Sequence, residues 1–364
     1  MSEMQEMIME STEKILKEYS KKEIVNEAEN GIWAKELWDN LEAYGMLKVA
    51  VPEELMGNGG DQYDAFSILY LIGKYSAPIP LAENYIVNKL LMDLGESVQD
   101  EFITISATEH KNLFQIREKD DGWIVSGKAK YVPWARFAQK ILVLGETEED
   151  TKLALLPLDN AKIKEGKNLA GEARDEVFFD NVYVEEIKTK SVDIEEQVEK
   201  ILYTGGLTRS VMMVGALENL LALTKEHISE RSQFGRPLYR FQAVQQHMAQ
   251  LAGEFAATNV AVKNAISSYE KNPVSKEIAF AKLRVNEAIE KVNPIAHQIL
   301  AAIGFTFEHT LHHSTRRLWS WREEFGKESD WEQIIAKDLM NLNQNELWSL
   351  ITNVENSSQK VDVK

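Results

Sequence analysis

The residues best suited to chemistry in this chain lie in one short run, residues 231–237, which reads RSQFGRP. It follows a long amphipathic stretch and leads into Phe241 and Gln242. A guanidinium suits phosphate oxygens because it donates two parallel hydrogen bonds, and an aromatic ring beside it can lie against a flat ligand. The run therefore predicts a grip on an anionic, aromatic cofactor. Each residue also has a plainer interpretation, since an arginine at a helix C-terminus favours the helix dipole and an aromatic residue can belong to the core.

A second group of side chains that could do chemistry comprises Glu308, His309, His312 and His313. Glu308 and His312 are four residues apart, as are His309 and His313, which would put each pair on one helix face within reach of a metal ion. The chain has no HExxH motif, and no other cluster supplies a third ligand, so we expect no metal site. Gly-x-Ser-x-Gly, P-loop and dinucleotide-fold glycine patterns are also absent, which leaves hydrolase, kinase and nicotinamide chemistry without support.

Composition and charge narrow the classes of function further. The chain has 364 residues and a formal net charge of −17, which argues against nucleic acid as a partner, because phosphates need clustered Lys and Arg. It has no cysteine, so disulfides, thiolate metal sites and cysteine nucleophiles are excluded. The N-terminus is acidic rather than basic and then apolar, and no apolar run approaches the ~20 residues that cross a bilayer. We therefore expect a cytoplasmic protein with no membrane partner.

Hydrophobic periodicity divides the chain into three regions. From Met4 to about Asp100, apolar residues recur every three or four positions, as in amphipathic helices. The middle has short apolar stretches separated by Asp- and Gly-rich turns, with a hairpin turn at residues 120–122, and predicts strands. Helical spacing returns from about Val192. We predict an α+β multi-domain fold with an N-terminal helical domain (1–101), a middle β-barrel-like domain (102–190), a C-terminal four-helix bundle (191–355) and a polar tail (356–364).

Local signatures follow one another along nearly the whole chain. They are Tyr44-Gly45-Met46 with Val51-Pro52-Glu53, Ala107-Thr108-Glu109, Gly122 to Gly127 with Tyr131-Val132-Pro133, Val177 to Val184, the run from Arg231, and Gln298 to Glu308 with Arg316-Arg317. In this order they resemble the acyl-CoA dehydrogenases. The resemblance implies the fold of that family, a bound FAD, and an oxidoreductase that removes hydrogen from the α,β C–C bond of a CoA thioester.

The resemblance also implies roles for the residues in and after the run from Arg231. Arg231 itself would contact the FAD pyrophosphate. Gln233 and Phe234 would lie against the adenosine half of the cofactor. Phe241 and Gln242 would follow it along the next helix.

Further cofactor residues are implied elsewhere in the chain. Gln298 would reach a cofactor bound mainly by a neighbouring subunit, so the resemblance implies at least a dimer. Tyr131 and Pro133 belong to the strand pair that faces the flavin, and Pro133 stands where the family often has a hydroxyl residue near flavin N5. Proline has no side-chain donor and no N–H. Ala301 and Ala302 replace a glycine pair that lets the backbone approach the cofactor closely.

The catalytic base of the family has no counterpart at either of its usual positions. Its chemistry needs a desolvated carboxylate that removes the α-proton while the β-hydrogen leaves as hydride. The resemblance places the usual glutamate at Phe325, before Gly326, and the position used by some relatives at Gly205. Glu324 is the nearest carboxylate and therefore the candidate base. Adjacent helical side chains diverge by ~100°, so Glu324 would need an altered backbone, and a solvated charge in the run 322–324 is the alternative.

These departures leave two hypotheses about function. The Phe325-Gly326 ending and the run from Leu311 to Arg317 resemble a divergent bacterial branch of the family, in which some members work as heteromeric pairs with one subunit lacking the base. The first hypothesis is a flavoprotein acting on acyl-CoA, as a homo-oligomer or with a partner subunit, which passes electrons to an electron-transferring flavoprotein. The second is a non-catalytic subunit that binds FAD only through a shared interface.

Overall fold

The computed structural model describes residues 3–93, 95–98, 101–106, 113–340, 342 and 347, so the Ala107-Thr108-Glu109 signature and the polar tail lie outside the described residues. The N-terminal helices are α1 (Glu3–Tyr19), α2 (Lys22–Glu29), α3 (Lys35–Ala43), α4 (Gln62–Lys74) and α5 (Leu81–Asp93). The middle strands are β1 (Ile103–Ile105), β2 (Phe114–Lys119), β3 (Gly122–Pro133), β4 (Lys140–Glu146), β5 (Thr151–Pro157), β6 (Lys162–Lys164), β7 (Arg174–Val184) and β8 (Lys188–Ser191). The C-terminal elements are α6 (Ile194–Glu230), β9 (Ser232–Gln233), β10 (Arg236–Pro237), α7 (Gln242–Tyr269), α8 (Lys276–Leu300), η5 (Ala301–Phe305), α9 (Leu311–Glu323) and α10 (Glu328–Met340).

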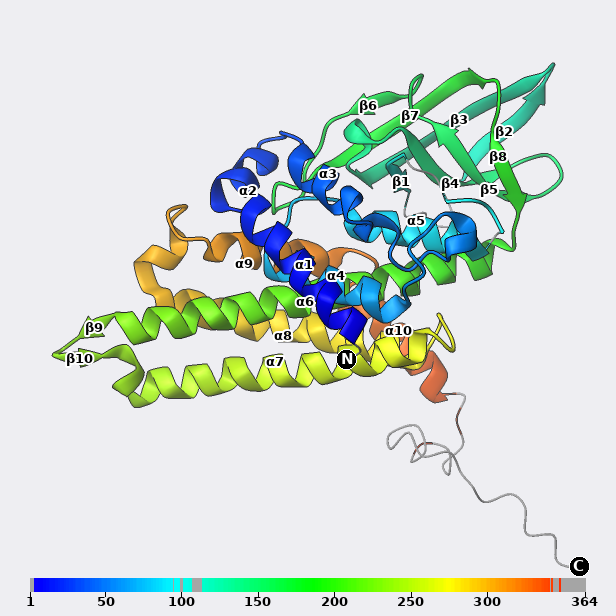
Figure 1. Ribbon diagram of the computed structural model, residues 1–364. Coiled ribbons are helices and arrows are strands. Elements are labelled where there is room, and N and C mark those ends of the chain that lie inside the picture. Colours follow the sequence, from blue (N-terminus) through cyan, green and yellow to red (C-terminus); the bar gives the residue numbers. More distant parts are fainter. Residues whose placement is uncertain are drawn as a thin grey trace, which may run out of the picture.

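Figure 1 shows these groups as a long helical bundle with the sheet at one end and the N-terminal helices packed along it. The predicted order of helical, β and helical regions is confirmed. The middle strands form one sheet in the order β6-β7-β3-β2-β4-β5-β8, with β1 paired to β4. The predicted hairpin turn is also confirmed, because Lys119 pairs with Gly122 and Asp120 has the positive φ of 52° that a tight hairpin loop needs.

The central strand β4 is buried on both faces of the sheet. Along β4, Ile141 and Val143 belong to one hydrophobic core, whereas Leu142 and Leu144 belong to another that also contains apolar residues of α5. A strand covered on both sides reads as a continuous apolar run instead of an alternating one. This burial explains why the sequence of β4 is apolar at four consecutive positions.

Helix α6 is the spine that joins the N-terminal helices to the bundle, and it packs against α4, α5, α7, α8 and α9. A Cβ on Gly215 of α6 would lie 2.0 Å from the backbone oxygen of Tyr70, and one on Gly73 of α4 would lie 1.9 Å from that of Met212. Such distances show that the two helix backbones are in direct contact, which only glycine permits. Within the described ranges, no helix is both long and apolar enough to cross a membrane.

Candidate active site

A cleft of about 680 Å³ opens where the end of β3 meets α6 and the C-terminal end of α9. Its lining includes Tyr131 and Pro133 from β3, and Glu324 and Phe325 from the segment after α9. The structure therefore brings the predicted flavin-facing residues together with the candidate base and one of the two usual base positions. These residues are distant in sequence, and the docking of the sheet against the bundle places them around one cavity.

A β-bulge shapes the wall of the cleft that β3 provides. The pairing of β3 with β7 shifts register between Ala129 and Val132, and Tyr131 inside this irregularity has a φ of 56°. A bulge commonly re-aims a side chain next to a functional site. The Tyr131 side chain is 77% exposed, and Pro133 offers neither a hydroxyl nor an N–H to the cleft.

The two positions to which the resemblance assigns the base, Gly205 and Phe325, face each other directly. A Cβ built on Gly205 of α6 would lie 2.1 Å from Cδ1 of Phe325, so the phenylalanine ring fills the space that a side chain at position 205 would need. Phe325 has a φ of 53° and Gly326 a φ of 94°, which turn the chain after α9 and direct the ring toward α6. Neither position offers a proton acceptor. A hydrocarbon ring fills the place that the resemblance predicts for the carboxylate.

Glu324 is held in a buried ion-pair cluster. Its carboxylate accepts hydrogen bonds from Nε of Arg174 at 2.9 Å and from Nε of Arg209 at 2.7 Å, and its side chain is 19% exposed. It follows the last helical residue of α9 and has an extended backbone. Burial raises the pKa of Glu324, but Arg174 and Arg209 outweigh that effect and lower it to about 2. The alternative of a solvated charge is therefore wrong. A base for α-proton removal needs a raised pKa, and that of Glu324 is lowered.

Glu324 belongs to a network of ion pairs, most of them buried, in which positive and negative side chains alternate across all three regions. Arg209 also pairs with Glu83 of α5, and Arg174 pairs with Glu172. From Glu172 the ion-pair network continues through Arg317 to Glu29 and Arg316. Removing one partner of such a buried pair is typically destabilising by about 3–5 kcal/mol because the other charge is left uncompensated. This ion-pair network fixes the N-terminal helices and the sheet against the bundle.

The histidine cluster does not favour a metal site. The described residues bring Glu29, His312 and His313 together, with potential ligand atoms within 4.8 Å of one another. Glu29 is already bonded to Arg316 and Arg317, whose positive charges would repel a cation. Burial and the charge of Arg317 lower the pKa of His313 to about 2, which keeps the ring neutral, and its Nε2 lies 2.8 Å from Oδ1 of Asn26. The cluster joins α2 to α9.

The predicted residues for the nucleotide half of FAD lie far from the cleft. Arg231, Gln233 and Phe234 belong to the β9–β10 hairpin, which Figure 1 shows at the opposite end of the bundle from the sheet. From Gly205 to Arg231, α6 rises about 40 Å along its axis. The end of α8 and η5 lie at the same end of the bundle as the hairpin (Figure 1). That end therefore holds a second group of predicted residues, namely Phe241, Gln242, Gln298, Ala301 and Ala302.

The side chains at this end of the bundle, from the hairpin and from the second group together, are chemically suited to an anionic, aromatic ligand. In the described part of the structure, the exposed side chain of Arg231 has no ion pair or hydrogen bond. The Phe234 side chain is 91% exposed, and the Phe241 ring beside it carries Arg236 at 4.1 Å from its centroid. Ala301 adopts φ 54° and ψ −137°, a region that glycine favours, so the chain keeps a glycine-like backbone at this position.

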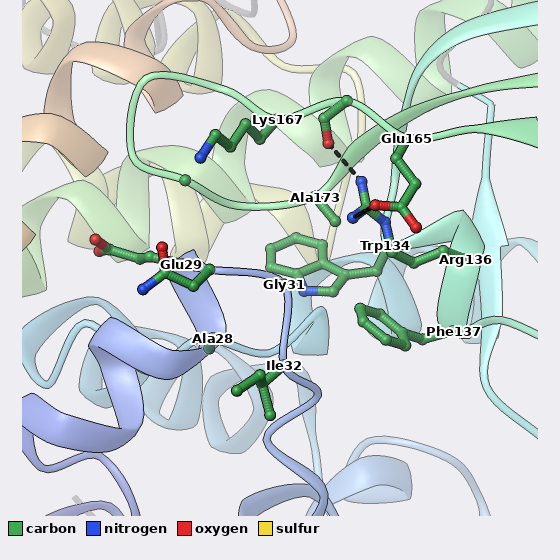
Figure 2. A pocket seen from close by; sticks show the side chains of 13 residues that line it. Ala28, Glu29, Gly31, Ile32, Trp134, Arg136, Phe137, Glu165, Lys167 and Ala173 are labelled. Carbon is green, nitrogen blue, oxygen red and sulfur yellow. Dashed lines mark hydrogen bonds and ion pairs between the residues drawn. The ribbon is translucent and has the colours of Figure 1, made fainter.

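A smaller hollow of about 270 Å³ lies beside the cleft (Figure 2). Figure 2 shows the Trp134 indole near Gly31, with Arg136 bonded to Glu165 and to the backbone oxygen of Gly166. Trp134 also lies 4.7 Å from the guanidinium of Arg174, a residue that lines the cleft. The indole thus separates the hollow from the cleft. None of the candidate catalytic or flavin-facing residues lines the hollow, so the cleft is the candidate active site.

One carboxylate in the cleft escaped the sequence analysis as a separate candidate. Glu323 lines the cleft, is exposed, and makes no ion pair or hydrogen bond within the described ranges. It had been visible in the sequence only as part of an acidic run. The sequence shows Glu323 only as a carboxylate two residues before Phe325. The tertiary structure is needed to distinguish it from its neighbour Glu324, because only Glu324 is held by arginines.

The fold is helical–β–helical, with a cleft between the sheet and the bundle and an exposed aromatic and cationic group at the far end of the bundle. Residues 2–104 match the acyl-CoA dehydrogenase N-terminal domain, and residues 196–340 match the acyl-CoA dehydrogenase C-terminal domain. The chain belongs to the acyl-CoA dehydrogenase family. Members of this family are FAD flavoproteins, and its named homologues are oxidoreductases that act on CH–CH groups.

Individual relatives are distant in sequence. The chain is 24% identical over 315 residues to acyl-CoA dehydrogenase IpdE2 of Mycolicibacterium smegmatis, covering 85% of this chain and 91% of that protein. It is 21% identical to the caffeyl-CoA reductase-Etf complex subunit CarC of Acetobacterium woodii, over 81% of this chain and 88% of that one. The fold matches the ChsE4-ChsE5 complex from Mycobacterium tuberculosis with a TM-score of 0.83 at 19% identity, over 94% of this chain and 99% of that one.

Proposed function

We propose that this chain is a FAD-binding subunit of a heteromeric acyl-CoA dehydrogenase and that it lacks a catalytic base of its own. The observation that carries this proposal is the contact between Gly205 and Phe325, because a single phenyl ring fills the space of both positions that the resemblance assigns to the carboxylate. A phenyl ring cannot accept a proton. Oxidation of the α,β bond of a CoA thioester would then depend on a base in the cleft of the partner subunit.

In this proposal, the residues of this chain bind FAD and orient it. When bound, FAD supplies the acceptor for the hydride that leaves the β-carbon. Arg231 would hold the pyrophosphate, and Phe234 would lie against the adenosine half. Because these residues are about 40 Å along α6 from the level of Gly205, they would serve a flavin whose ring lies in a neighbouring subunit's cleft. Electron-transferring flavoprotein is the proposed acceptor, in line with the Etf complex to which the related CarC belongs.

A second candidate function is a catalytic homo-oligomer in which Glu323 removes the α-proton. The favouring observation is that this carboxylate lines the cleft without a cation partner among the described residues. Its exposure works against it, because an efficient base is desolvated so that its pKa rises toward the working pH. Glu324, the candidate from the sequence, is less suitable still because two arginines stabilise its charged form.

The test measures flavin reduction by the purified chain. The wild-type protein is loaded with FAD and titrated anaerobically with CoA thioesters of increasing acyl length while the flavin absorbance is recorded. The proposal expects no bleaching by any of them. The Phe325→Glu variant is expected to bleach with at least one thioester, because it restores a carboxylate opposite Gly205.

Three controls separate the possible outcomes. Phe325→Gln matches the size of the glutamate without its basicity and should not bleach. Bleaching by the wild-type chain that is abolished in Glu323→Gln would support the second candidate and overturn the first. Bleaching by the wild-type chain that is abolished in Glu324→Gln, and not in Glu323→Gln, would overturn both and restore the base inferred from the sequence.

A further inference from the structure

A second large cavity, of about 570 Å³, lies between the N-terminal helices and the bundle. It is bounded by α1, α4, α6 and α7, and none of its lining residues lines the cleft. Its floor is apolar and includes Phe66, Val211, Val214 and Val262, which are at most 4% exposed. Pockets of roughly 300–1,000 Å³ with an apolar lining and a few polar groups are typical of small-molecule sites.

Three of the polar side chains that line this cavity have no hydrogen-bond or ion-pair partner among the described residues. Tyr63, Asn259 and Lys263 all line it, and the described residues provide no hydrogen bond or ion pair to any of the three side chains. The other polar groups at the rim differ, since Tyr70 donates to Glu218 and Gln5 donates to Ser67. A cation and two uncharged polar groups at the edge of an apolar cavity complement a ligand with one anionic group and a long apolar body.

The cavity is isolated from the flavin chemistry. Between residues 70 and 73 of α4 and residues 212 and 215 of α6 the two backbones touch, so no channel passes between these helices at that crossing. The cavity opens beside α1 and α7, whereas the cleft opens beside β3 and the end of α9. A ligand here would leave the cleft free.

We propose that this cavity is a binding site for a long-chain carboxylate, whose hydrocarbon chain lies on the floor formed by Phe66, Val211, Val214 and Val262. The carboxylate pairs with Lys263 and accepts a hydrogen bond from Tyr63 or from the amide of Asn259. The site joins α1 and α4 to α6 and α7, so an occupied cavity stabilises the N-terminal helices on the bundle. The proposal is independent of the base in the cleft.

The test is a displacement titration with the FAD-loaded full-length protein. A fluorescent polyene fatty acid is bound first and displaced with palmitate, and methyl palmitate serves as the comparator without a charge. The expected result is one saturable palmitate site per chain, with methyl palmitate at least tenfold weaker. Lys263→Ala should weaken palmitate at least tenfold and leave methyl palmitate unchanged. Lys14→Ala on α1, an exposed lysine that does not line the cavity, is the charge-matched control and should change neither.

A second variant and three further measurements, namely circular dichroism, competition by acyl-CoA and sedimentation, keep the outcomes distinct. Asn259→Trp fills the cavity from α7 and should abolish palmitate binding with an unchanged circular dichroism spectrum. Binding that survives both Lys263→Ala and Asn259→Trp, or that is competed by acyl-CoA at the cleft, would overturn the proposal. If Asn259→Trp instead lowers the oligomeric mass measured by sedimentation, the cavity is filled by a second copy of the chain and the proposal is also wrong.

Discussion

The ring of Phe325 occupies the space directly over Gly205, with only 2.1 Å between Cδ1 and the position of a Cβ at residue 205. This relationship joins two residues that are far apart in sequence, one on α6 and one just after α9. It means that the two positions depend on each other, because a side chain at 205 and a ring at 325 exclude one another. Phenylalanine at position 325 therefore requires glycine at position 205, so the residue that stands in place of a base at one position also excludes a base from the other.

The first prediction follows from this exclusion. Gly205→Ala should destabilise the protein by about 1–3 kcal/mol, the usual cost of overpacking a filled site. In a Phe325→Ala background the same change should stabilise by up to about 1 kcal/mol, because alanine favours a helix interior over glycine. Urea unfolding of the four proteins in this double-mutant cycle measures the coupling.

Gly253→Ala on α7 is the matched control for that cycle. A Cβ at Gly253 would meet no heavy atom within 4 Å, so this change should show the helix benefit without the steric cost. Additive effects of the changes at residues 205 and 325 would contradict the contact.

The second prediction concerns Glu324. Glu324→Gln should destabilise the protein by about 3–5 kcal/mol at neutral pH, because Arg174 and Arg209 lose the charge between them. The folded-state pKa of about 2 lies below the ordinary 4.5, so the charge stabilises fully above about pH 4.5 and that stabilisation is lost as the pH falls toward 2. A drop of this size in the pKa on folding corresponds to about 3 kcal/mol.

The measurement is the free energy of unfolding from pH 3 to 7 for the wild type and for Glu324→Gln. The difference between the two should be largest above pH 4.5 and should shrink as the pH falls. Glu323→Gln, next to it but without a cation partner in the described structure, should change stability by less than about 0.5 kcal/mol. Equal effects of the two substitutions would show that the buried ion pairs do not form.

The third prediction concerns the backbone at Ala301. Ala301→Gly should stabilise the protein by about 1 kcal/mol, because glycine adopts φ 54° and ψ −137° without the strain that a Cβ introduces there. Ala302→Gly should instead destabilise by roughly 0.5–1 kcal/mol, since its φ is not positive and glycine only adds unfolded-state entropy. Thermal unfolding of both variants checks the pair, and changes of the same sign would argue against the strained backbone.

The fourth prediction addresses FAD binding by the assembled protein. Arg231→Ala should weaken FAD binding at least tenfold, and Arg231→Lys should recover only part of the loss because lysine lacks the planar fork that binds phosphate. Flavin fluorescence during dialysis against decreasing FAD concentrations measures the effect. Lys225→Ala, an exposed lysine on the same helix, is the control and should leave the affinity unchanged. Equal losses of FAD affinity in Arg231→Ala and Lys225→Ala would show that Arg231 contributes only through its positive charge and does not contact the pyrophosphate.

The strands differ in how far the sequence could predict them. The apolar runs at residues 141–144 and 153–156 predict β4 and β5, whereas nothing in the sequences of β6 and β8, at the two ends of the sheet order, predicts a strand. β6 reads KIK and β8 reads KTKS, so neither has enough apolar residues to show a period. Such edge strands are defined by hydrogen bonds to a neighbouring strand, which no local pattern contains.

The sequence by itself determined the order of helical and β regions, the prediction of a cofactor grip at the run from Arg231, and the lack of a carboxylate at residues 205 and 325. These features depend on residue type and local spacing, which determine periodicity and turn formation. Only the tertiary structure decided that Phe325 fills the space over Gly205 and that Glu324 is neutralised by partners 150 and 115 residues away in the chain. Ion pairs and ring contacts over such separations form only when the sheet docks on the bundle, and their energy depends on burial that no local sequence pattern reveals.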